Sequence, residues 1–460
     1  MRPRNQTARD QLSVTIARRA AVSAPELAMQ LNVSIPTLHR ALSEVGDRLL
    51  VTGKARRTRY ALRRSLRGEA AALPLYEVDR LGRPRLLGPL SLVYPEGSHL
   101  QLGPAGWPVP DESKDGWWSG LPYPLYDMRP QGYMGRQLAR AEHRNLGVSA
   151  NPEDWSDDDV AFVLSRLGSD VSGSLILGDG ALQRWQADKL AALDPLPGRA
   201  LAKAYAALAE RAVAAGIAGS SAAGEFPKFA ASRELDGMLT PHVLVKFSGA
   251  DGSPAVQRWS DLLVCEHLAL EAASSLPGLA AARSRILQHG GRCFLEVERF
   301  DRHGAFGRSR LASLATVDAA LIGDGASDWT RVSARMAAAG RLSTDDVLRI
   351  QHLWWFGRLI ANSDMHAGNL SFEPHQGVLH LAPAYDMLPM RYAPLAGGEV
   401  APGSYEPPVP LPTQRAVWDM SCKAALGFWR AAARDRRISE AFRQICVQNQ
   451  ERLQRVADRL

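Results

Sequence analysis

Polar side chains that could carry out phosphoryl transfer follow a predicted buried helix late in the chain. Asp364, His366 and Asn369 come directly after the apolar, Trp-rich run 347–360, and Asp386 follows two short β-like runs. Asp364 and Asn369 are five residues apart, as the catalytic Asp and the metal-binding Asn are in a kinase catalytic loop. In such a loop a carboxylate orients the attacking hydroxyl, and oxygen ligands hold Mg²⁺ on the phosphates. We therefore expect Asp364 to be the base, and Asn369 with Asp386 to bind magnesium.

Two other interpretations of this stretch stay open. Asp and Asn are frequent in helix caps and turns, so any one of these residues could have a structural role alone. A metal-hydrolase site could use Asp364, His366, His375 and His380, but no two of the histidines have the one-turn spacing of H-E-x-x-H. The ordered set of polar residues favours phosphoryl transfer.

A lysine in a β-branched run could bind the phosphates. Lys246 lies near the end of the run 242–247, and burying it costs several kcal/mol unless an anion pairs with it. The helix predicted over 261–273 offers Glu266 and Glu271, of which Glu266 is nearer the middle. The alternative is a lysine on an edge strand whose ammonium reaches water.

Two further segments complete the order of parts in a kinase. The loop 219–229 is rich in small residues, which allow backbone N–H groups to approach phosphates. The run 293–302 is a predicted strand that leads to a polar turn, where a kinase hinge would bind adenine and ribose. Each signal is weak alone, but together they follow the order that kinases require.

Length, composition and charge place these segments in a multidomain protein. With 460 residues we expect two to four domains, and the hydrophobic content of 46% is ordinary for a folded chain. No run of eighteen apolar residues and no secretory leader is present, so we expect a cytoplasmic protein without a membrane partner. The four scattered cysteines fit reduced thiols. Residues 1–65 contain 13 Lys and Arg against four Asp and Glu, so the net charge of +7 comes from this segment.

The basic N-terminal segment has the pattern of a winged helix-turn-helix. A helix is predicted over 11–21, a second starts at the cap Ser23 with Glu26 three residues later, and a third covers 35–45. A basic hairpin follows over 48–62 and would form the wing. We expect base contacts from Thr37, His39 and Arg40, and backbone contacts from Lys54, Arg56, Arg57 and Arg59. A protein-binding winged helix is the alternative, and an Ala- and Arg-rich connector over 63–72 joins this head to the rest.

Four motifs in combination resemble the HipA family of toxin–antitoxin serine/threonine kinases. They are S-S-A-A-G-E-F-P-K at 220–228, E-R-F-D-R at 298–302, S-D-M-H-A-G-N at 363–369 and A-Y-D-M-L at 384–388. With its N-terminal winged helix the chain is similar to the YjjJ-type branch. The resemblance covers about residues 70–455 and implies an α+β, two-lobed, protein-kinase-related fold. The domains expected are the head at 1–65, a linker with a β-rich N-lobe at 66–300, and a helical C-lobe at 301–460.

The resemblance also implies roles for individual residues, with ATP and Mg²⁺ as cofactors. Asp364 would be the catalytic base and His366 would organise its loop. Glu298 and Phe300 would contact adenine and Asp301 the ribose. Ser221, with Ser220 as a rival, would be the site of autophosphorylation. The residues assigned to ATP are Ser221, Ala222, Ala223, Gly224, Lys246, Glu298, Phe300 and Asp301.

Partners follow from the same resemblance. It implies a protein substrate such as a translation factor, and it leaves open an antitoxin partner and a homodimer. The chain departs from the family pattern at two points. Gly368 stands where relatives often carry a basic residue, which could change contacts with phosphate. The fused DNA-binding head takes a role that usually belongs to a separate antitoxin. The competing hypotheses are a transcriptional regulator with a nucleotide-sensing pseudokinase body and a Mg²⁺-dependent nuclease.

Overall fold

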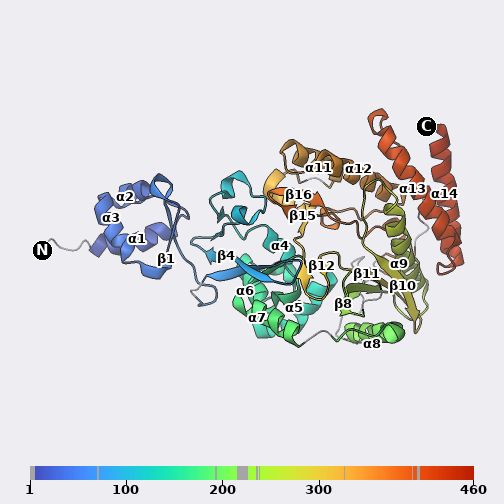
Figure 1. Cartoon of the computed structure of the whole chain (residues 1–460), viewed down its shortest axis with the longest axis horizontal. Helices are drawn as coiled ribbons and strands as arrows, with labels where there is room; N and C mark the ends of the chain where they lie inside the picture. The colour runs from blue at the N-terminus through green and yellow to red at the C-terminus, as the bar shows by residue number, and fades with distance from the viewer. Residues whose placement is uncertain are drawn as a thin grey trace.

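The chain forms an elongated molecule with a small head at one end of its long axis. The computed structural model describes residues 6–69, 72–191, 194–214, 226–234, 237, 239–325, 327–395, 397–400, 403 and 405–460. Figure 1 shows the head at the N-terminal end and the last two helices at the opposite end. Among the described residues, no helix combines the length and the apolar character that crossing a membrane requires.

The head has the elements of a winged helix, as the sequence predicts. Its elements are α1 (Gln6–Ala17), α2 (Ala24–Leu31), α3 (Ile35–Ser43), β1 (Leu49–Thr52) and β2 (Arg59–Leu62). Ser23 and Glu26 form the predicted capping box at the start of α2. The first helix lies earlier than the predicted range 11–21, because the chain leaves the helix after Ala17 and Val22 forms a β-bridge with Tyr60.

In its described part, the connector expected at 63–72 is hydrogen-bonded to the middle segment. Arg63 forms a β-bridge with Val93, and the Tyr94 N–H donates to the Leu62 carbonyl at 2.9 Å. Arg64 also pairs with Asp158 in the helix α6 (Asp157–Leu167). These contacts fix the head against the middle segment.

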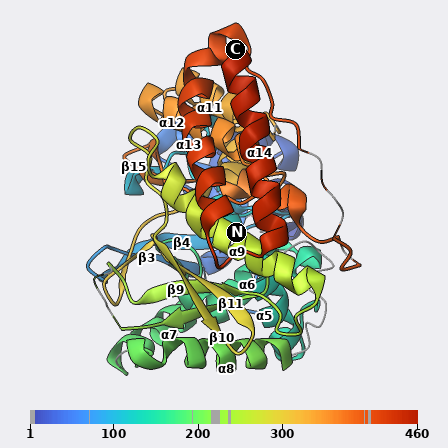
Figure 2. The ribbon, with the colours of Figure 1, turned by 90° about the vertical axis from the view of Figure 1, so that its right-hand side faces the viewer.

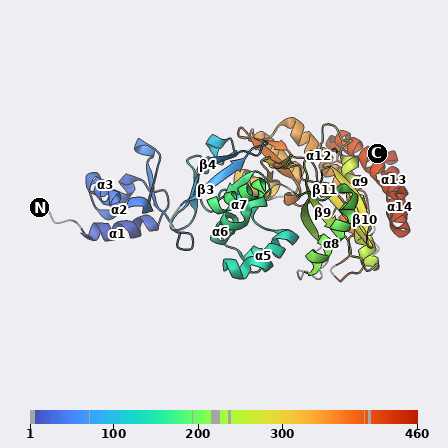
Figure 3. The same ribbon diagram turned by 60° about the horizontal axis from the view of Figure 1, so that its bottom comes forward.

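The middle segment is built on a five-stranded sheet of strand order β6-β5-β4-β3-β7. Its strands are β3 (Leu73–Val78), β4 (Pro84–Leu92), β5 (Ser98–His99), β6 (Trp117–Trp118) and β7 (Leu175–Leu177). The helices of the segment are α4 (Pro124–Met128), α5 (Gly132–Leu146), α6 and α7 (Asp179–Leu190), and Figure 3 shows α5 to α7 gathered on one side of β3 and β4. The predicted range 66–300 thus contains this sheet and a second, separate one.

The second sheet has the strand order β10-β11-β9-β8 and is covered on both faces. Its strands are β8 (Lys228–Ser232), β9 (His242–Phe247), β10 (Ser284–His289) and β11 (Arg292–Glu298). Helix α9 (Pro254–Ala273) lies on one face and α8 (Leu201–Ala214) on the other (Figure 2). On the α8 face, Val243, Val245 and Phe247 pack against Tyr205. Lys246, between two of them in the strand, points to the α9 face.

Helices dominate the rest of the chain. They are α10 (Leu314–Val317), α11 (Trp329–Ala338), α12 (Thr344–Leu359), α13 (Arg415–Arg434) and α14 (Glu440–Arg459). The short strands are β12 (Arg302–His303), β13 (Gly307–Arg308), β14 (Ala312–Ser313), β15 (Ser371–His375) and β16 (Val378–Leu381). The predicted hairpin is present as β15 and β16, which pair antiparallel. The expected α+β architecture, with a sheet lobe followed by a helical lobe, is confirmed.

Candidate active site

A buried ion cluster joins the sheet lobe to the helical lobe. The Lys246 ammonium donates to both carboxylate oxygens of Glu266, each at 2.8 Å, and also to the carboxylate of Asp386. Glu266 is therefore the partner on α9, as its central position indicated. Strand β9 lies between β11 and β8, so the edge-strand interpretation of Lys246 is wrong. The cluster brings together a sheet lysine, a helix carboxylate and a loop carboxylate that are distant in the sequence.

The predicted base loop begins where α12 ends. The helix stops at Leu359, and Ala361 adopts a left-handed conformation with φ of 60° that turns the chain out of the helix. The next residue, Asn362, is buried and its side-chain oxygen accepts the Asp364 N–H at 3.0 Å. Asp364 itself is exposed, and its carboxylate makes no hydrogen bond or ion pair with any other described residue. It is accessible to a substrate hydroxyl.

The two predicted metal ligands flank this loop. The buried Asn369 donates its side-chain N–H to the Asp364 carbonyl at 2.8 Å, which leaves its amide oxygen for a cation. Asp386 has a left-handed backbone with φ of 56°, and its side chain is 31% exposed. An amide oxygen and a carboxylate fit Mg²⁺, which usually takes few protein ligands and keeps waters and phosphate oxygens. These two residues would hold the ion.

His366 lies in the same loop and organises its backbone. Its ring Nδ1 accepts the Gly368 N–H at 3.0 Å, and its carbonyl accepts the Trp329 indole N–H at 3.3 Å. The carbonyl of Gly368 in turn accepts the Tyr385 hydroxyl at 2.7 Å. His366 therefore contacts the backbone of its own loop, and its organising role stays a prediction.

One ammonium faces two carboxylates in this cluster, and this imbalance sets their pKa values. Burial raises the pKa of Glu266 to about 7, because Lys246 offsets the burial only partly and Asp386 adds repulsion. Burial also disfavours the charged form of Asp386, but the ammonium of Lys246 outweighs it and lowers the pKa of Asp386. The charge of Lys228, which lies opposite Lys246 on β8, also favours the ionised form of both carboxyl groups; it adds to the lowered pKa of Asp386 and only partly offsets the raised pKa of Glu266.

The predicted hinge contacts the segment that bears Asp386 through a pair of aromatic rings. The ring centroids of Phe300 and Tyr385 are 5.7 Å apart, and Tyr385 directly precedes Asp386. The Glu298 side chain lies on the opposite sheet face from Lys246, where it accepts the Leu239 N–H at 3.3 Å. A contact of Glu298 with adenine would therefore involve its backbone, as in the hinge expected from the sequence.

Asp301 is placed differently from the expected ribose contact. Its carboxylate is buried and accepts from Arg302 at 2.6 Å, from the Gly173 N–H at 2.9 Å and from Arg299 at 3.1 Å. Asp170, in the middle segment, pairs with the same two arginines. A ribose contact would have to displace bonds of this network, so the geometry favours a structural role for Asp301.

Other predicted site residues lie outside the described residues or on the distant head. Ser220, Ser221, Ala222, Ala223 and Gly224 belong to the first group. In the head, His39, Arg40, Lys54, Arg56 and Arg57 are exposed on α3 and between β1 and β2. Thr37 is half-buried and its hydroxyl is hydrogen-bonded to Ser34, the cap of α3, at 2.9 Å. Arg59 is half-buried and donates to the carbonyls of Arg56 and Thr58.

Sequence reasoning missed Asn362, Tyr385 and Lys228 as parts of this site. Asn362 had a detectable signal, because Asn two residues before a polar loop residue often accepts its N–H in an Asx turn. Lys228 was visible as the only lysine in the 219–229 segment, but its partner strand was not. The hydrogen bonds of Tyr385 to Gly368 and Ser371 depend on tertiary structure and have no local pattern.

The structure gives no support to the metal-hydrolase interpretation. Within the described ranges, no group of three or more His, Cys, Asp or Glu side chains is placed to hold a metal ion.

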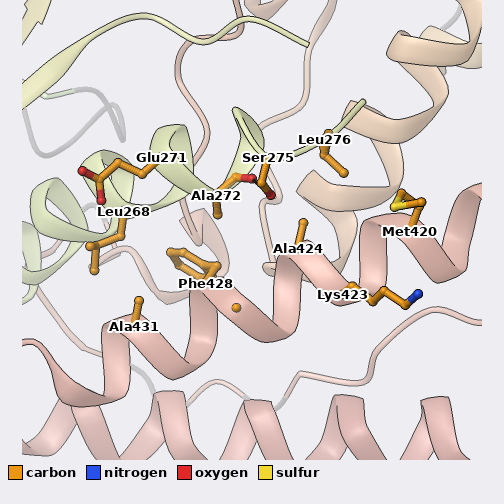
Figure 4. A pocket seen from close by; sticks show the side chains of 11 residues that line it. Leu268, Glu271, Ala272, Ser275, Leu276, Met420, Lys423, Ala424, Phe428 and Ala431 are labelled. Carbon is orange, nitrogen blue, oxygen red and sulfur yellow. Dashed lines mark hydrogen bonds between the residues drawn. The ribbon is translucent and has the colours of Figure 1, made fainter. Parts of the chain in front are cut away.

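A groove of ≈ 380 Å³ opens between α9 and α13, lined by Leu268, Ala272 and Phe428 with Glu271 and Lys423 at its rim (Figure 4). Of the residues considered for the site it contains only Glu271, the candidate that does not pair with Lys246.

Comparisons with known proteins agree on one family. The profile of the YjjJ-like toxin middle domain matches residues 69–186, and that of the HipA-like C-terminal domain matches residues 220–453. The toxin YjjJ of Escherichia coli K12 is 37% identical over 439 residues, which cover 95% of this chain and 96% of that protein.

Two solved structures are also similar. The HipA toxin in a complex of Shewanella oneidensis MR-1 HipA, HipB and operator DNA has a TM-score of 0.47 and 15% identity, covering 83% of this chain and 95% of that one. The proinflammatory kinase CtkA of Helicobacter pylori has a TM-score of 0.27 and 16% identity, covering 35% of this chain and 53% of its own.

Proposed function

Since the chain belongs to the HipA-like family, in the branch of YjjJ-type toxins, we propose that it is an ATP- and Mg²⁺-dependent serine/threonine protein kinase. The observation that carries the proposal is the ion cluster of Lys246, Glu266 and Asp386, joined through Asn362 to the loop that bears Asp364. A lysine–glutamate pair and an aspartate for magnesium must both be in place in an active kinase.

Each residue has one task in this proposal. Lys246, held by Glu266, binds phosphate oxygens of ATP, and Asp364 orients the hydroxyl of a serine or threonine on a protein substrate. Asn369 and Asp386 hold Mg²⁺, which when bound neutralises charge on the phosphates. The transfer forms a bond between the substrate oxygen and the γ-phosphorus and breaks the bond to ADP, while the hydroxyl proton goes to the Asp364 carboxylate. Ser221 or Ser220 would be the acceptor in autophosphorylation.

Transfer of label from γ-labelled ATP to protein tests this function. The wild type with Mg²⁺ should label itself or proteins of a cell lysate, and Asp364→Ala should lower the rate by about 10²- to 10⁴-fold. Ser363→Ala changes the exposed neighbouring side chain and serves as the matched control. Mass spectrometry of the labelled peptides would identify the substrate, for which a translation factor is the expected class.

Other outcomes would identify the alternatives. ATP binding without any transfer by the wild type would indicate the nucleotide-sensing pseudokinase body of a regulator. Plasmid cleavage with Mg²⁺ in the absence of ATP would indicate the nuclease.

A second function, DNA binding, is favoured by the exposed basic residues of the head. The five exposed residues His39, Arg40, Lys54, Arg56 and Arg57 come from α3 and from the segment between β1 and β2, the parts of a winged helix that contact DNA. The head would bind DNA as a basic recognition unit. A separate antitoxin and a homodimer remain predictions about further partners.

A further inference from the structure

A buried amide connects the two loops that the proposed reaction needs. Asn362 is 8% exposed and accepts the Asp364 N–H at 3.0 Å with its side-chain oxygen. Its side-chain nitrogen donates to the Asp386 carbonyl at 3.4 Å. One side chain therefore contacts the backbone of both the predicted base and a predicted metal ligand.

Chemistry fixes the orientation of this amide. The Asp364 N–H requires an acceptor and the Asp386 carbonyl requires a donor, so a flipped amide would face both groups with the wrong atoms. The Asn362 N–H itself is held by the Gly357 carbonyl of α12 at 2.9 Å. The amide is thus anchored to the helix that carries the whole loop.

The backbone that Asn362 holds is unfavourable by itself. Asp386 has φ of 56°, a left-handed conformation that is unfavourable for a non-glycine residue and persists only when its surroundings enforce it. The carboxylate of Asp386 also accepts a hydrogen bond from the Lys246 ammonium. The bond from Asn362 opposes any relaxation of this backbone.

We propose that Asn362 is a positioning residue that keeps the base Asp364 and the metal ligand Asp386 in one fixed arrangement. This inference rests on the proposed kinase function and adds a residue that touches neither ATP nor the substrate. Its loss separates two loops that must act on the same γ-phosphate.

Two variants test the inference with Mn²⁺ as the metal probe. Asn362→Asp keeps the acceptor for Asp364 but turns a carboxylate oxygen toward the Asp386 carbonyl. Asn362→Leu removes both bonds at similar volume. With a non-hydrolysable ATP analogue present, electron paramagnetic resonance should show Mn²⁺ affinity weakened about 10- to 100-fold in both variants, the usual cost of losing a group that orients a metal ligand. Phosphoryl transfer should fall about 10²-fold through kcat.

A matched control separates positioning from general stability. Asn449 is 1% exposed and its amide bonds the Tyr392 hydroxyl, so Asn449→Leu also removes a buried amide but touches neither loop. It should leave Mn²⁺ affinity unchanged at a comparable loss of unfolding free energy. Should Asn362→Leu fail to fold, the nearly isosteric Asn362→Asp decides. If Asn362→Asp binds Mn²⁺ as tightly as the wild-type protein and has the same kcat, the inference is overturned. If the wild-type protein itself transfers no phosphoryl group, the proposed function is overturned instead.

Discussion

Glu266 holds Lys246 with both of its carboxylate oxygens, each 2.8 Å from the ammonium nitrogen. Their side chains are only 1% and 10% exposed, and the Asp386 carboxylate completes the cluster from the helical lobe. With two carboxylates around one ammonium, the cluster carries a formal excess of one negative charge. The raised pKa of Glu266 relieves this excess, because the carboxyl group binds a proton more readily than a free glutamate does.

Removing the lysine should destabilise the fold as well as stop phosphoryl transfer. In Lys246→Met the buried Glu266 loses its counter-ion, and breaking a buried pair in this way costs about 3–5 kcal/mol. The double variant Lys246→Met/Glu266→Leu should recover most of that loss and remain inactive. Urea denaturation followed by fluorescence measures the unfolding free energy of both variants, and transfer of label from ATP measures their activity. An equal loss of unfolding free energy in the single and double variants would contradict the ion-pair explanation.

The pKa of Glu266 predicts a dependence of stability on pH. It is raised from 4.5 to about 7 in the folded chain, so the folded state binds a proton that the unfolded state has released. The stabilisation from this group is fully present below pH 4.5 and is lost as the pH rises toward about 7. Asp386 behaves in the opposite way: its pKa is lowered from 3.8, so its stabilisation is present above that pH and is lost at lower pH.

Glu266→Gln isolates the first of these terms. Urea denaturation at about pH 5 and about pH 8 should show that the unfolding free energy of the wild type, relative to this variant, is lower at the higher pH. Glu451→Gln, at an exposed position of α14, is the control and should retain the wild-type dependence. A wild-type minus Glu266→Gln difference that rises with pH would show that the pKa is lowered instead.

The sequence predicts the site where chemistry needs a particular residue type at a fixed spacing. The five-residue interval from Asp364 to Asn369 and the hairpin that leads to Asp386 are local patterns, and both are present. The capping box at Ser23 and Glu26 is equally local. Glu266 could be preferred over Glu271 because it lies nearer the middle of the predicted helix, although only the structure shows that it faces the sheet.

Interactions between distant segments could not be predicted in the same way. Asp301 was assigned to ribose by motif, but its partner Gly173 lies 128 residues earlier in the chain. Helix α9 begins at Pro254 rather than at the predicted Asp261, and the Ser253 side chain caps it by accepting the Val256 N–H. The attachment of the head by Arg64 and Asp158 depends on a contact between elements that no local pattern encodes.

Asp301→Asn should distinguish a structural role from a ribose contact. The substitution removes one of the two carboxylates that pair with Arg299 and Arg302, while Asp170 still pairs with both. It should therefore lower the unfolding free energy by less than the about 3–5 kcal/mol lost when a buried charge is left without a partner. The KM for ATP should change little in the fraction that stays folded. A raised KM at unchanged urea midpoint would restore the ribose contact. Asp115→Asn, at a position where no ion pair is present among the described residues, is a control for the loss of charge alone.

DNA binding by the head should depend on salt through the wing arginines. If Lys54, Arg56, Arg57 and Arg59 each neutralise one phosphate, the slope of log K against log salt should be about −3.6, from roughly −0.9 per contact. Arg56 and Arg57 are exposed, so Arg56→Gln/Arg57→Gln should leave the fold intact and reduce the slope by about 1.8. Fluorescence anisotropy with duplex DNA at several salt concentrations measures this. Arg430→Gln/Arg434→Gln removes two exposed charges from α13 and should keep the wild-type slope. A flat salt dependence of the wild type would contradict phosphate contacts and favour a protein partner for the head.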